Sequence, residues 1–285
     1  MQRRRLGRTG HESSVAILGG AAFALSTTAE AEPAFAAALA RGVNHLDIAP
    51  RYGDAERAVG PLVPAVRDRL FIGEKTTRRA ADGVRAQLDE SLQRLQTDHV
   101  DLYQMHAVTG IDVLDERADA ADAIMRARDE GLTRFIGITG HGLAAPATFV
   151  EALGRYDLDT VMFPVYPRMW ADVDYRRAAE ELLSICADRD LGVMAIKAVA
   201  RQPWSDDDRD RFATTWYEPR REPDSIARGV HFALSTPGVH AFCTPGDLAL
   251  LPLALDAAER DLVMDDDARV AAMDEMAGFA PLQAP

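Results

Sequence analysis

Short apolar runs alternate along this chain with longer segments whose apolar residues recur at helical spacing. The short runs predict eight strands, at 15–18, 43–47, 70–75, 100–105, 135–139, 160–163, 192–196 and 240–242. Segment 80–95 shows the longer pattern, because its apolar residues Val84, Leu88, Leu92 and Leu95 are three or four positions apart. Strands and helices that alternate at intervals of about 25 to 35 residues are typical of a parallel sheet covered by helices.

Further helices are predicted between and after these strands, at 29–41, 54–66, 115–130, 145–153, 175–189, 224–234 and 250–258. Three aspartates at 265–267 predict the start of one more helix, which ends near Met276. Residues 2–11 predict a short hairpin lid, and Gly19 and Gly20 end the first strand where the backbone can approach another group closely. Eight strand and helix pairs close a ring. We therefore predict an α/β fold, a (β/α)8 TIM barrel, as a single domain over residues 1–285.

The alternative is an open doubly wound sheet, which is built from the same alternation of strands and helices. Its dinucleotide fingerprint, Gly-x-Gly-x-x-Gly after the first strand, is missing, since 18–23 reads Leu-Gly-Gly-Ala-Ala-Phe. One long connection, at 197–223 after the seventh strand, carries Trp204, Trp216 and Tyr217 among many charged residues. Long connections of this kind serve as lids or binding loops, so we predict a lid, with a solvated insertion as the alternative.

The amino-acid composition and net charge limit the kinds of molecule that the protein is expected to bind. The 285 residues are 47% hydrophobic, with a formal net charge of −13 and a pI near 5.0, and this charge argues against nucleic acids and anionic membranes as partners. No apolar run approaches the roughly 18 residues of a membrane span, and no signal-peptide pattern follows the N-terminal arginines. Cys186 and Cys243 fit neither a metal-ligand spacing nor a disulfide framework. These features predict a cytoplasmic protein without a metal site and leave its oligomeric state open.

Candidate chemistry gathers at three consecutive strand ends. The second strand ends in Asp47, with Tyr52 in the loop beyond it, the third ends in Lys75, and His106 follows the fourth. In a parallel barrel these ends share one mouth, and the two-residue period of a strand points Asp47 and Lys75 into it. A buried lysine needs an anion, which makes Asp47 its predicted partner. We expect the ammonium to lower the pKa of Tyr52, so that the phenol donates a proton more readily.

Each of these residues has an ordinary structural explanation when it is taken alone. Asp47 and Lys75 can form a barrel ion pair, Tyr52 can be a rim residue, and His106 can be a hydrogen-bonded core histidine. Four such side chains at three consecutive strand ends instead favour proton transfer, with His106 donating a hydrogen bond to a substrate oxygen.

Several segments of the chain resemble the aldo-keto reductase family. The matching segments are Arg-Leu-Gly-Arg-Thr-Gly at 5–10, Gly-Val-Asn-His-Leu-Asp-Ile-Ala at 42–49 with Tyr52, Gly53 and Glu56, and the stretches at 135–141, 216–219 and 234–239. The likeness covers nearly the whole chain. It implies a (β/α)8 barrel that binds a nicotinamide cofactor, usually NADPH, without a Rossmann domain.

The resemblance also implies roles for individual residues. By position, Tyr52 is the general acid, Asp47 and Lys75 tune it, and His106 orients the carbonyl. The cofactor supplies the hydride, while the protein supplies orientation and electrostatics.

The departures from the family pattern fall mainly in the expected cofactor site. Thr139, Gly140 and His141 replace a frequent Ser-Asn pair, Met162 replaces a usual Gln, and Lys197 stands near the position of a Tyr that often stacks on the nicotinamide. We still expect the cofactor to contact Gly20, Thr139, His141, Met162, Lys197, Gly246, Asp247 and Asp256. Phe163 or Tyr166 provides an aromatic face or simply packs, and Lys197 pairs with a phosphate or lines the substrate pocket.

The stretch 245–256 bears on the choice between NADPH and NADH. Family members usually hold the adenosine 2′-phosphate here with a cation or a serine, but this stretch carries no cation and begins with Pro245, Gly246 and Asp247. A carboxylate repels a phosphate and accepts a hydrogen bond from a ribose hydroxyl. Alternatively, Asp247 only starts the next helix and a cation from another loop holds the phosphate. We therefore predict NADPH or NADH with weak discrimination.

Together these features predict a reductase that converts an aldehyde or ketone to an alcohol with NAD(P)H. The first alternative is a cofactor-binding regulatory protein with little turnover, as some family relatives are subunits of potassium channels. A barrel lyase or isomerase without nicotinamide is the second, and it leaves the matching segments unexplained. The sequence does not identify the substrate.

Overall fold

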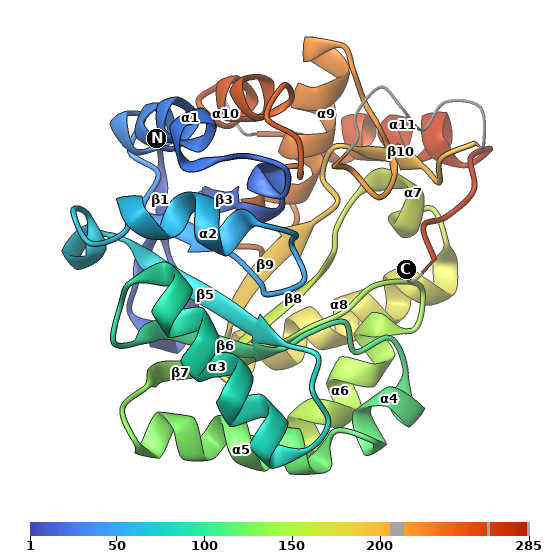
Figure 1. The fold of residues 1–285 in the computed structure, drawn as a ribbon. Coiled ribbons are helices and arrows are strands. Elements are labelled where there is room, and N and C mark those ends of the chain that lie inside the picture. Colours follow the sequence, from blue (N-terminus) through green and yellow to red (C-terminus); the bar gives the residue numbers. More distant parts are fainter. Residues whose placement is uncertain (206–213, 261–262, 284–285) are drawn as a thin grey trace.

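Eight parallel strands close into a barrel in the computed structural model, which describes residues 1–205, 214–260 and 263–283 (Figure 1). Around the ring the barrel strands are β3 (Ala16–Gly19), β4 (His45–Asp47), β5 (Phe71–Thr76), β6 (Val100–Met105), β7 (Thr133–Thr139), β8 (Thr160–Pro164), β9 (Gly192–Ile196) and β12 (Ala241–Cys243). The last strand pairs with the first, because Phe242 lies opposite Ala16 in a parallel register. The predicted (β/α)8 barrel is therefore confirmed.

Helices surround the strands (Figure 1). They are α1 (Thr28–Ala40), α2 (Ala55–Val59), α3 (Ala81–Leu95), α4 (Ile111–Asp115), α5 (Ala118–Asp129), α6 (Ala145–Arg155), α7 (Pro167–Trp170), α8 (Val173–Asp188), α9 (Pro223–Leu234), α10 (Leu251–Ala258) and α11 (Asp266–Met276). Local sequence explains several boundaries. Thr27 and Glu30 form a capping box at the start of α1, and the carboxylate of Asp265 accepts from the backbone of Ala268 at the start of α11.

The sequence patterns misplace some helix boundaries. The helix predicted at 54–66 is wrong beyond Val59, where a short 3₁₀ turn (Gly60–Leu62) replaces it. Gly60 passes so close to α3 that an added Cβ would lie 1.9 Å from the carbonyl oxygen of Arg94, and Pro61 follows directly. The short helices α4 and α7 have no counterpart in the prediction, because their four or five residues are too few to show a helical period.

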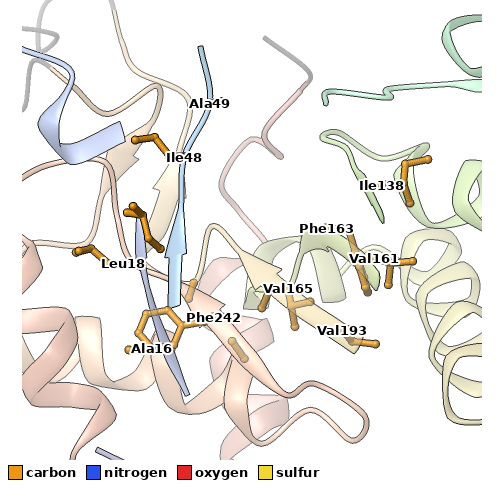
Figure 2. Close-up of a cluster of buried hydrophobic side chains, with 14 of the residues drawn as sticks. Ala16, Leu18, Ile48, Ala49, Ile138, Val161, Phe163, Val165, Val193 and Phe242 are labelled. Atoms are coloured by element: carbon orange, nitrogen blue, oxygen red, sulfur yellow. The ribbon is translucent and has the colours of Figure 1, made fainter. Parts of the chain in front are cut away.

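Strand alternation produces two apolar layers. Side chains such as Leu18, Val161, Phe163 and Val193 belong to the large core cluster between the strands and the helices (Figure 2). The strand positions between these point into the barrel and, with Leu6 from outside the strands, form a smaller cluster there. Its members are Leu6, Ile17, Phe71, Leu102, Met162, Met194, Ile196 and Ala241. Inward positions nearer the carboxyl ends of the strands are thereby left for polar side chains.

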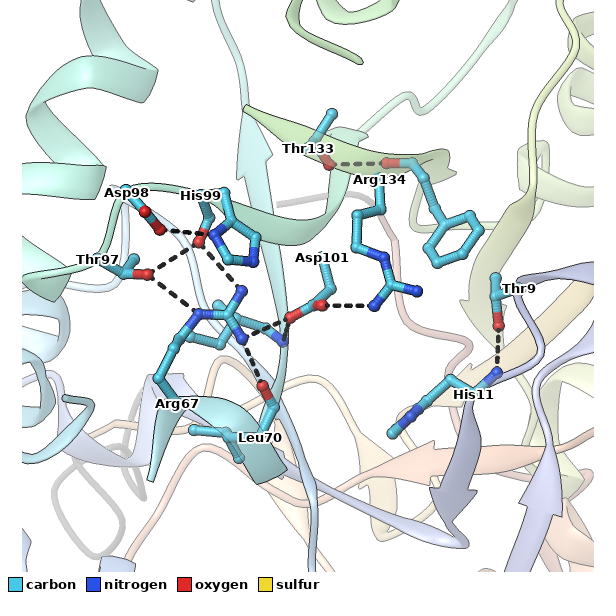
Figure 3. Close-up of polar contacts among 12 residues, drawn as sticks. Thr9, His11, Arg67, Leu70, Thr97, Asp98, His99, Asp101, Thr133 and Arg134 are labelled. Atoms are coloured by element: carbon cyan, nitrogen blue, oxygen red, sulfur yellow. Dashed lines mark hydrogen bonds and ion pairs between the residues drawn. The ribbon is translucent and has the colours of Figure 1, made fainter. Parts of the chain in front are cut away.

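The predicted hairpin lies at the amino end of the barrel, where its two strands β1 (Arg3–Arg5) and β2 (Glu12–Ser14) pair antiparallel. Leu6 enters the inner apolar cluster, and the His11 ring stacks on Phe71 at 4.3 Å. Figure 3 shows the polar network beside it, in which Asp101 binds the guanidinium groups of Arg67 and Arg134 at 3.0 and 3.3 Å. The hairpin thus closes the end of the barrel opposite the carboxyl ends of the strands.

The long connection after β9 contains a small ladder. Strands β10 (Ala200–Gln202) and β11 (Glu218–Pro219) pair antiparallel, and the indole of Trp204 donates a hydrogen bond to the carbonyl of Thr215 at 2.9 Å. Residues 206–213 of the predicted lid lie outside the described residues. In the described part of the chain, no helix has both the length and the apolar character required to cross a membrane.

Candidate active site

Four predicted polar side chains lie at the carboxyl end of the barrel. Asp47 is the last residue of β4, Lys75 lies near the end of β5, His106 follows β6, and Tyr52 is in the loop after β4. All four are buried, with exposed fractions of 2% for Asp47, 1% for Lys75, 5% for His106 and 8% for Tyr52. The fold therefore places the set together, in an environment where charges and hydrogen bonds are poorly screened.

Lys75 and Asp47 form the predicted buried ion pair. The ammonium of Lys75 lies 2.7 Å from the Asp47 carboxylate and donates a second hydrogen bond to the carbonyl of Ile48 at 3.0 Å. Burial, the largest single effect, lowers the pKa of Lys75, but Asp47 and the neighbouring Tyr52 together outweigh it, so that the pKa lies above its ordinary value. Lys75 is consequently a stable cation beneath the pocket.

Tyr52 lies between this cation and the histidine. The Lys75 ammonium is 4.9 Å from the centre of the Tyr52 ring, and the His106 ring is 5.7 Å away and nearly perpendicular to it. The expected lowering of the Tyr52 pKa is wrong for this structure. Burial raises the pKa of the phenol above its ordinary value, because a phenolate would lose hydration, and Lys75 offsets only part of this effect. Tyr52 is therefore fully protonated at neutral pH.

His106 is a neutral imidazole. Burial and the nearby Lys75 cation hold its pKa well below the ordinary value. Its backbone is fixed, since its amide donates to the carbonyl of Thr76 at 2.8 Å and its carbonyl accepts from the guanidinium of Arg117. The ring nitrogen Nδ1 has no partner among the described residues. A neutral imidazole can donate a hydrogen bond from one ring nitrogen to a ligand oxygen.

The loop that carries Tyr52 is held by a close backbone approach. Gly53 has a φ of +54°, and an added Cβ would lie 2.4 Å from the carbonyl oxygen of Ala24. The same oxygen accepts a hydrogen bond from the amide of Asp54 at 2.9 Å. Only glycine fits this left-handed conformation and this spacing together, so Gly53 fixes the position of its neighbour Tyr52.

A pocket opens above these residues, with about 540 Å³ of space including the part open to solvent. It is lined by Gly19, Ala21, Asp47, Tyr52, Thr139, His141, Met162, Ile196, Lys197, Thr214, Thr215, Trp216, Tyr217, Cys243, Thr244 and Gly246. The half-exposed Trp216 ring lies 5.6 Å from the Tyr52 ring. The described part of the long connection thus contributes one wall of the pocket.

Most of the predicted cofactor residues reach this pocket. Thr139, His141, Met162, Lys197 and Gly246 line it directly. Gly20 lies just behind the lining, where an added Cβ would come within 2.9 Å of the carbonyl oxygen of Asp47.

Asp247 and Asp256, like Gly20, are not part of the lining. The carboxylate of Asp247 accepts from the Thr214 hydroxyl at 3.1 Å and from the Ala249 amide at 2.9 Å, so it braces the turn beside Gly246. Asp256 lies on α10 and binds Arg41, the residue directly after α1, at 2.8 Å.

Some of the aromatic residues near the site pack in the core, and others line the pocket. Phe163 stacks near Trp170, and the Tyr166 hydroxyl accepts a hydrogen bond from the Leu282 amide, so both are core residues. Trp216 and Tyr217 provide the aromatic faces of the pocket instead.

Sequence reasoning also missed two residues at the end of β12. Cys243 has its sulfur 3.7 Å from an oxygen of Asp47, and the hydroxyl of Thr244 accepts from the amide of Gly19 at 2.9 Å. Their positions at the end of the eighth strand could have indicated that they lie in the site, because the carboxyl ends of the barrel strands share one mouth.

The residues present fit a nicotinamide dinucleotide. The Nδ1 atom of His141 is buried and without a partner among the described residues, so it can bind a carboxamide group. Gly19 and Gly246 line the pocket without side chains and pack tightly against the protein, since an added Cβ would lie 2.5 Å from the Thr244 carbonyl oxygen in the first case and 3.1 Å from Ala21 in the second. The pocket thus offers aromatic faces, an imidazole nitrogen without a described partner and the backbone of two glycines.

Known proteins share this fold and parts of this sequence. The profile of the Aldo/keto reductase family matches residues 16–248. In the solved structure of an aldo-keto reductase from Bacillus halodurans in its holo form, 98% of that chain superimposes on 99% of this one, with a TM-score of 0.74 and 19% identity. This structural likeness shows the fold.

Curated relatives match over shorter segments. An uncharacterized oxidoreductase of Bacillus subtilis, YqkF, is 27% identical over 178 residues, which cover 58% of this chain and 54% of that protein. The L-galactose dehydrogenase of Arabidopsis thaliana is 32% identical over 152 residues, 48% of each chain. The chain thus spans about half the length of the curated relatives it matches.

Proposed function

This chain belongs to the aldo/keto reductase family, and from that premise we propose that it reduces an aldehyde or ketone to an alcohol with NADPH or NADH. The observation that carries the proposal is the buried arrangement of Tyr52, Lys75, Asp47 and His106 at the carboxyl end of the barrel. A carbonyl that accepts a hydride needs a proton donor for its oxygen and a group that positions that oxygen. This arrangement provides both.

Each residue of the set has a distinct task in the proposed reaction. Tyr52 keeps its proton at neutral pH and gives it to the carbonyl oxygen. The negative charge that then develops on the phenol oxygen is stabilised by the Lys75 cation, which Asp47 holds in place. His106, neutral and fixed through its backbone, donates a hydrogen bond to the same carbonyl oxygen.

The cofactor, when bound, supplies the hydride. His141 would hold its carboxamide, while Gly19 and Gly246 would present backbone to it without side chains and Trp216 would cover the pocket. Excluding water from this pocket strengthens the electrostatic contacts around Tyr52.

Two measurements test the proposal in sequence. NADPH and NADH are first titrated into the protein while the tryptophan fluorescence is followed, since Trp216 lines the pocket. Turnover of the bound cofactor is then followed with a panel of aldehydes and ketones that includes a sugar, because one relative is named L-galactose dehydrogenase. Binding followed by turnover supports the reductase. Binding without turnover on any carbonyl favours a regulatory protein, and no binding rejects both.

A further inference from the structure

Lysine occurs at only two positions in this sequence, Lys75 and Lys197, and the other 30 of the 32 basic residues are arginines. Both lysines lie at the carboxyl ends of barrel strands, Lys75 in β5 and Lys197 directly after β9. Lysine differs from arginine in its compact ammonium and in the ease with which its pKa shifts. A chain that otherwise uses arginine for its cations therefore keeps lysine only at the barrel mouth.

The two lysines differ in their partners. Lys75 is neutralised by Asp47, whereas no carboxylate among the described residues forms an ion pair with Lys197. The Lys197 ammonium instead lies over two aromatic rings, 5.0 Å from the centre of Trp216 and 4.6 Å from that of Tyr217. Its backbone is in the left-handed region, with a φ of +68°, an uncommon conformation that tends to persist where the surrounding structure imposes it.

Among the described residues, the groups that face Lys197 leave its charge uncompensated. They are the Cys243 thiol at the end of β12, the His141 imidazole after β7 and the Tyr217 phenol, and all three are neutral at pH 7. Burial lowers the pKa of Lys197 to about 8, so that the lysine is mainly protonated at pH 7. A cation that has lost hydration without gaining an anion is costly, and a ligand that brings an anion relieves that cost.

Lys197 is also within reach of the proposed reaction centre. The Trp216 ring lies between Lys197 and Tyr52. Its centre is 5.0 Å from the Lys197 ammonium and 5.6 Å from the centre of the Tyr52 ring. All three residues line the same pocket. A small molecule whose carbonyl oxygen meets Tyr52 can therefore place a second group against Lys197.

We propose that Lys197 binds an anionic oxygen group of the ligand and so selects carbonyl substrates that carry a carboxylate. The inference rests on the proposed function and deepens it by naming a substrate class. A phosphate of the cofactor offers the same chemistry as a carboxylate. The experiments therefore separate these two sources of the anion.

The first experiment compares a charged substrate with a neutral one of the same shape, para-carboxybenzaldehyde and its methyl ester. In Lys197→Met we expect kcat/KM for the acid to fall at least about 30-fold more than kcat/KM for the ester, a difference that corresponds to about 2 kcal/mol. Lys197→Arg keeps the charge and should retain most of the activity on the acid. Equal losses for acid and ester, or no loss for either, overturn the proposal.

The second experiment does not depend on turnover. Because the chain has two lysines, labelling their ε-carbons gives two side-chain NMR signals, and Lys197→Met identifies the one from Lys197. We expect the pKa of Lys197, about 8 in the free protein, to rise by at least about one unit when benzoate is added. A rise with NADPH but not with benzoate contradicts the substrate class and assigns the anion to the cofactor. No rise with either ligand overturns anion binding altogether.

These outcomes remain distinct from failure of the proposed function. Turnover of the neutral methyl ester by the unaltered protein establishes carbonyl reduction whatever Lys197 binds. Absence of turnover on every carbonyl, with a raised Lys197 pKa in benzoate, rejects the reductase and keeps the anion site.

Discussion

Tyr52 and Lys75 are buried side by side, and burial acts in opposite directions on a phenol and an ammonium. It raises the pKa of Tyr52, and by itself it lowers that of Lys75, where Asp47 and Tyr52 together outweigh it. Both groups therefore keep their protons at neutral pH. A proton donor that is always loaded, next to a permanent cation, suits a reaction in which negative charge develops on the donor oxygen.

The Tyr52→Phe variant tests the proton donor. It removes one hydroxyl and leaves the ring contacts with His106 and Trp216 in place. We expect carbonyl reduction to fall by about 100-fold or more, the usual worth of a positioned acid, and the dissociation constant for NADPH to change only a few-fold. Steady-state turnover and fluorescence titration measure the two effects. Turnover close to that of the unaltered protein would rule out Tyr52 as the donor.

A double-mutant cycle tests the buried ion pair. Lys75→Met leaves the Asp47 carboxylate buried without a cation, so we expect activity to be lost and the free energy of unfolding to fall by about 3 kcal/mol. Adding Asp47→Asn removes the orphaned charge and should recover part of the stability but no activity. Denaturant unfolding of Lys75→Met, Asp47→Asn, the double variant and the unaltered protein measures this. A double variant no more stable than Lys75→Met would show that the two residues are not energetically coupled.

At the level of elements, the loop after β4 sets the position of Tyr52. In Gly53→Ala the new methyl group meets the carbonyl oxygen of Ala24 at 2.4 Å, in a backbone conformation that alanine disfavours. We expect a loss of stability on the order of 2 kcal/mol together with reduced turnover, because the loop must move. Thermal unfolding and steady-state kinetics measure both.

Gly154 provides a matched control for Gly53→Ala. It lies in the exposed last turn of α6, and an added Cβ would meet nothing within 4 Å. Gly154→Ala should therefore raise stability by about 0.5 to 1 kcal/mol and leave turnover unchanged. If both alanine variants behaved alike, the contact between Gly53 and Ala24 would not position the loop.

The turn after β12 governs the expected cofactor preference. Asp247 braces this turn through Thr214 and Ala249, and its negative charge lies beside Gly246 of the pocket lining. We expect the dissociation constants for NADPH and NADH to differ by less than about 10-fold, or 1.4 kcal/mol, as measured by fluorescence titration. Asp247→Asn removes the repulsion and should shift the preference towards NADPH by a few-fold. A thousand-fold preference of the unaltered protein for NADPH would contradict this account of the turn.

For the molecule as a whole, burial of neutral histidines links stability to pH. Burial lowers the pKa of His11 to about 4 from an ordinary value of 6.5. Between these two values the unfolded chain binds more protons than the folded one, so stability falls as the pH drops from 6.5 to 4. With a discount for partial exposure, His11 contributes about 2 kcal/mol to this loss.

The His11→Phe variant measures that contribution. Phenylalanine can keep the stacking on Phe71 and does not titrate. We expect the unfolding free energies of variant and parent to agree within about 1 kcal/mol near pH 8 and the variant to lose about 2 kcal/mol less on acidification to pH 4. Denaturant titrations at several pH values give both curves. Parallel curves would mean that His11 does not titrate differently on unfolding.

The barrel and the pairing of Asp47 with Lys75 were predictable from the sequence, because both follow from strand periodicity. The pKa of Tyr52 was not, since its sign depends on how completely the folded chain removes water from the phenol. Likewise, nothing local in the sequence shows that Trp216 approaches both Tyr52 and Lys197, because Tyr52 lies in the loop after β4 and Lys197 lies at the opposite end of the described connection after β9. Distances of this kind exist only after the barrel has closed.

Hydride transfer to a carbonyl carbon is the central claim, and isotope labelling tests it most directly. The unaltered protein is mixed with an aldehyde and with NADPH that carries deuterium at both C4 positions, and the alcohol is analysed by mass spectrometry. The account predicts one deuterium on the carbinol carbon of each product molecule, formed at a rate that Tyr52→Phe lowers by about 100-fold. An alcohol without deuterium, or cofactor binding with no alcohol from any member of the panel, would contradict it.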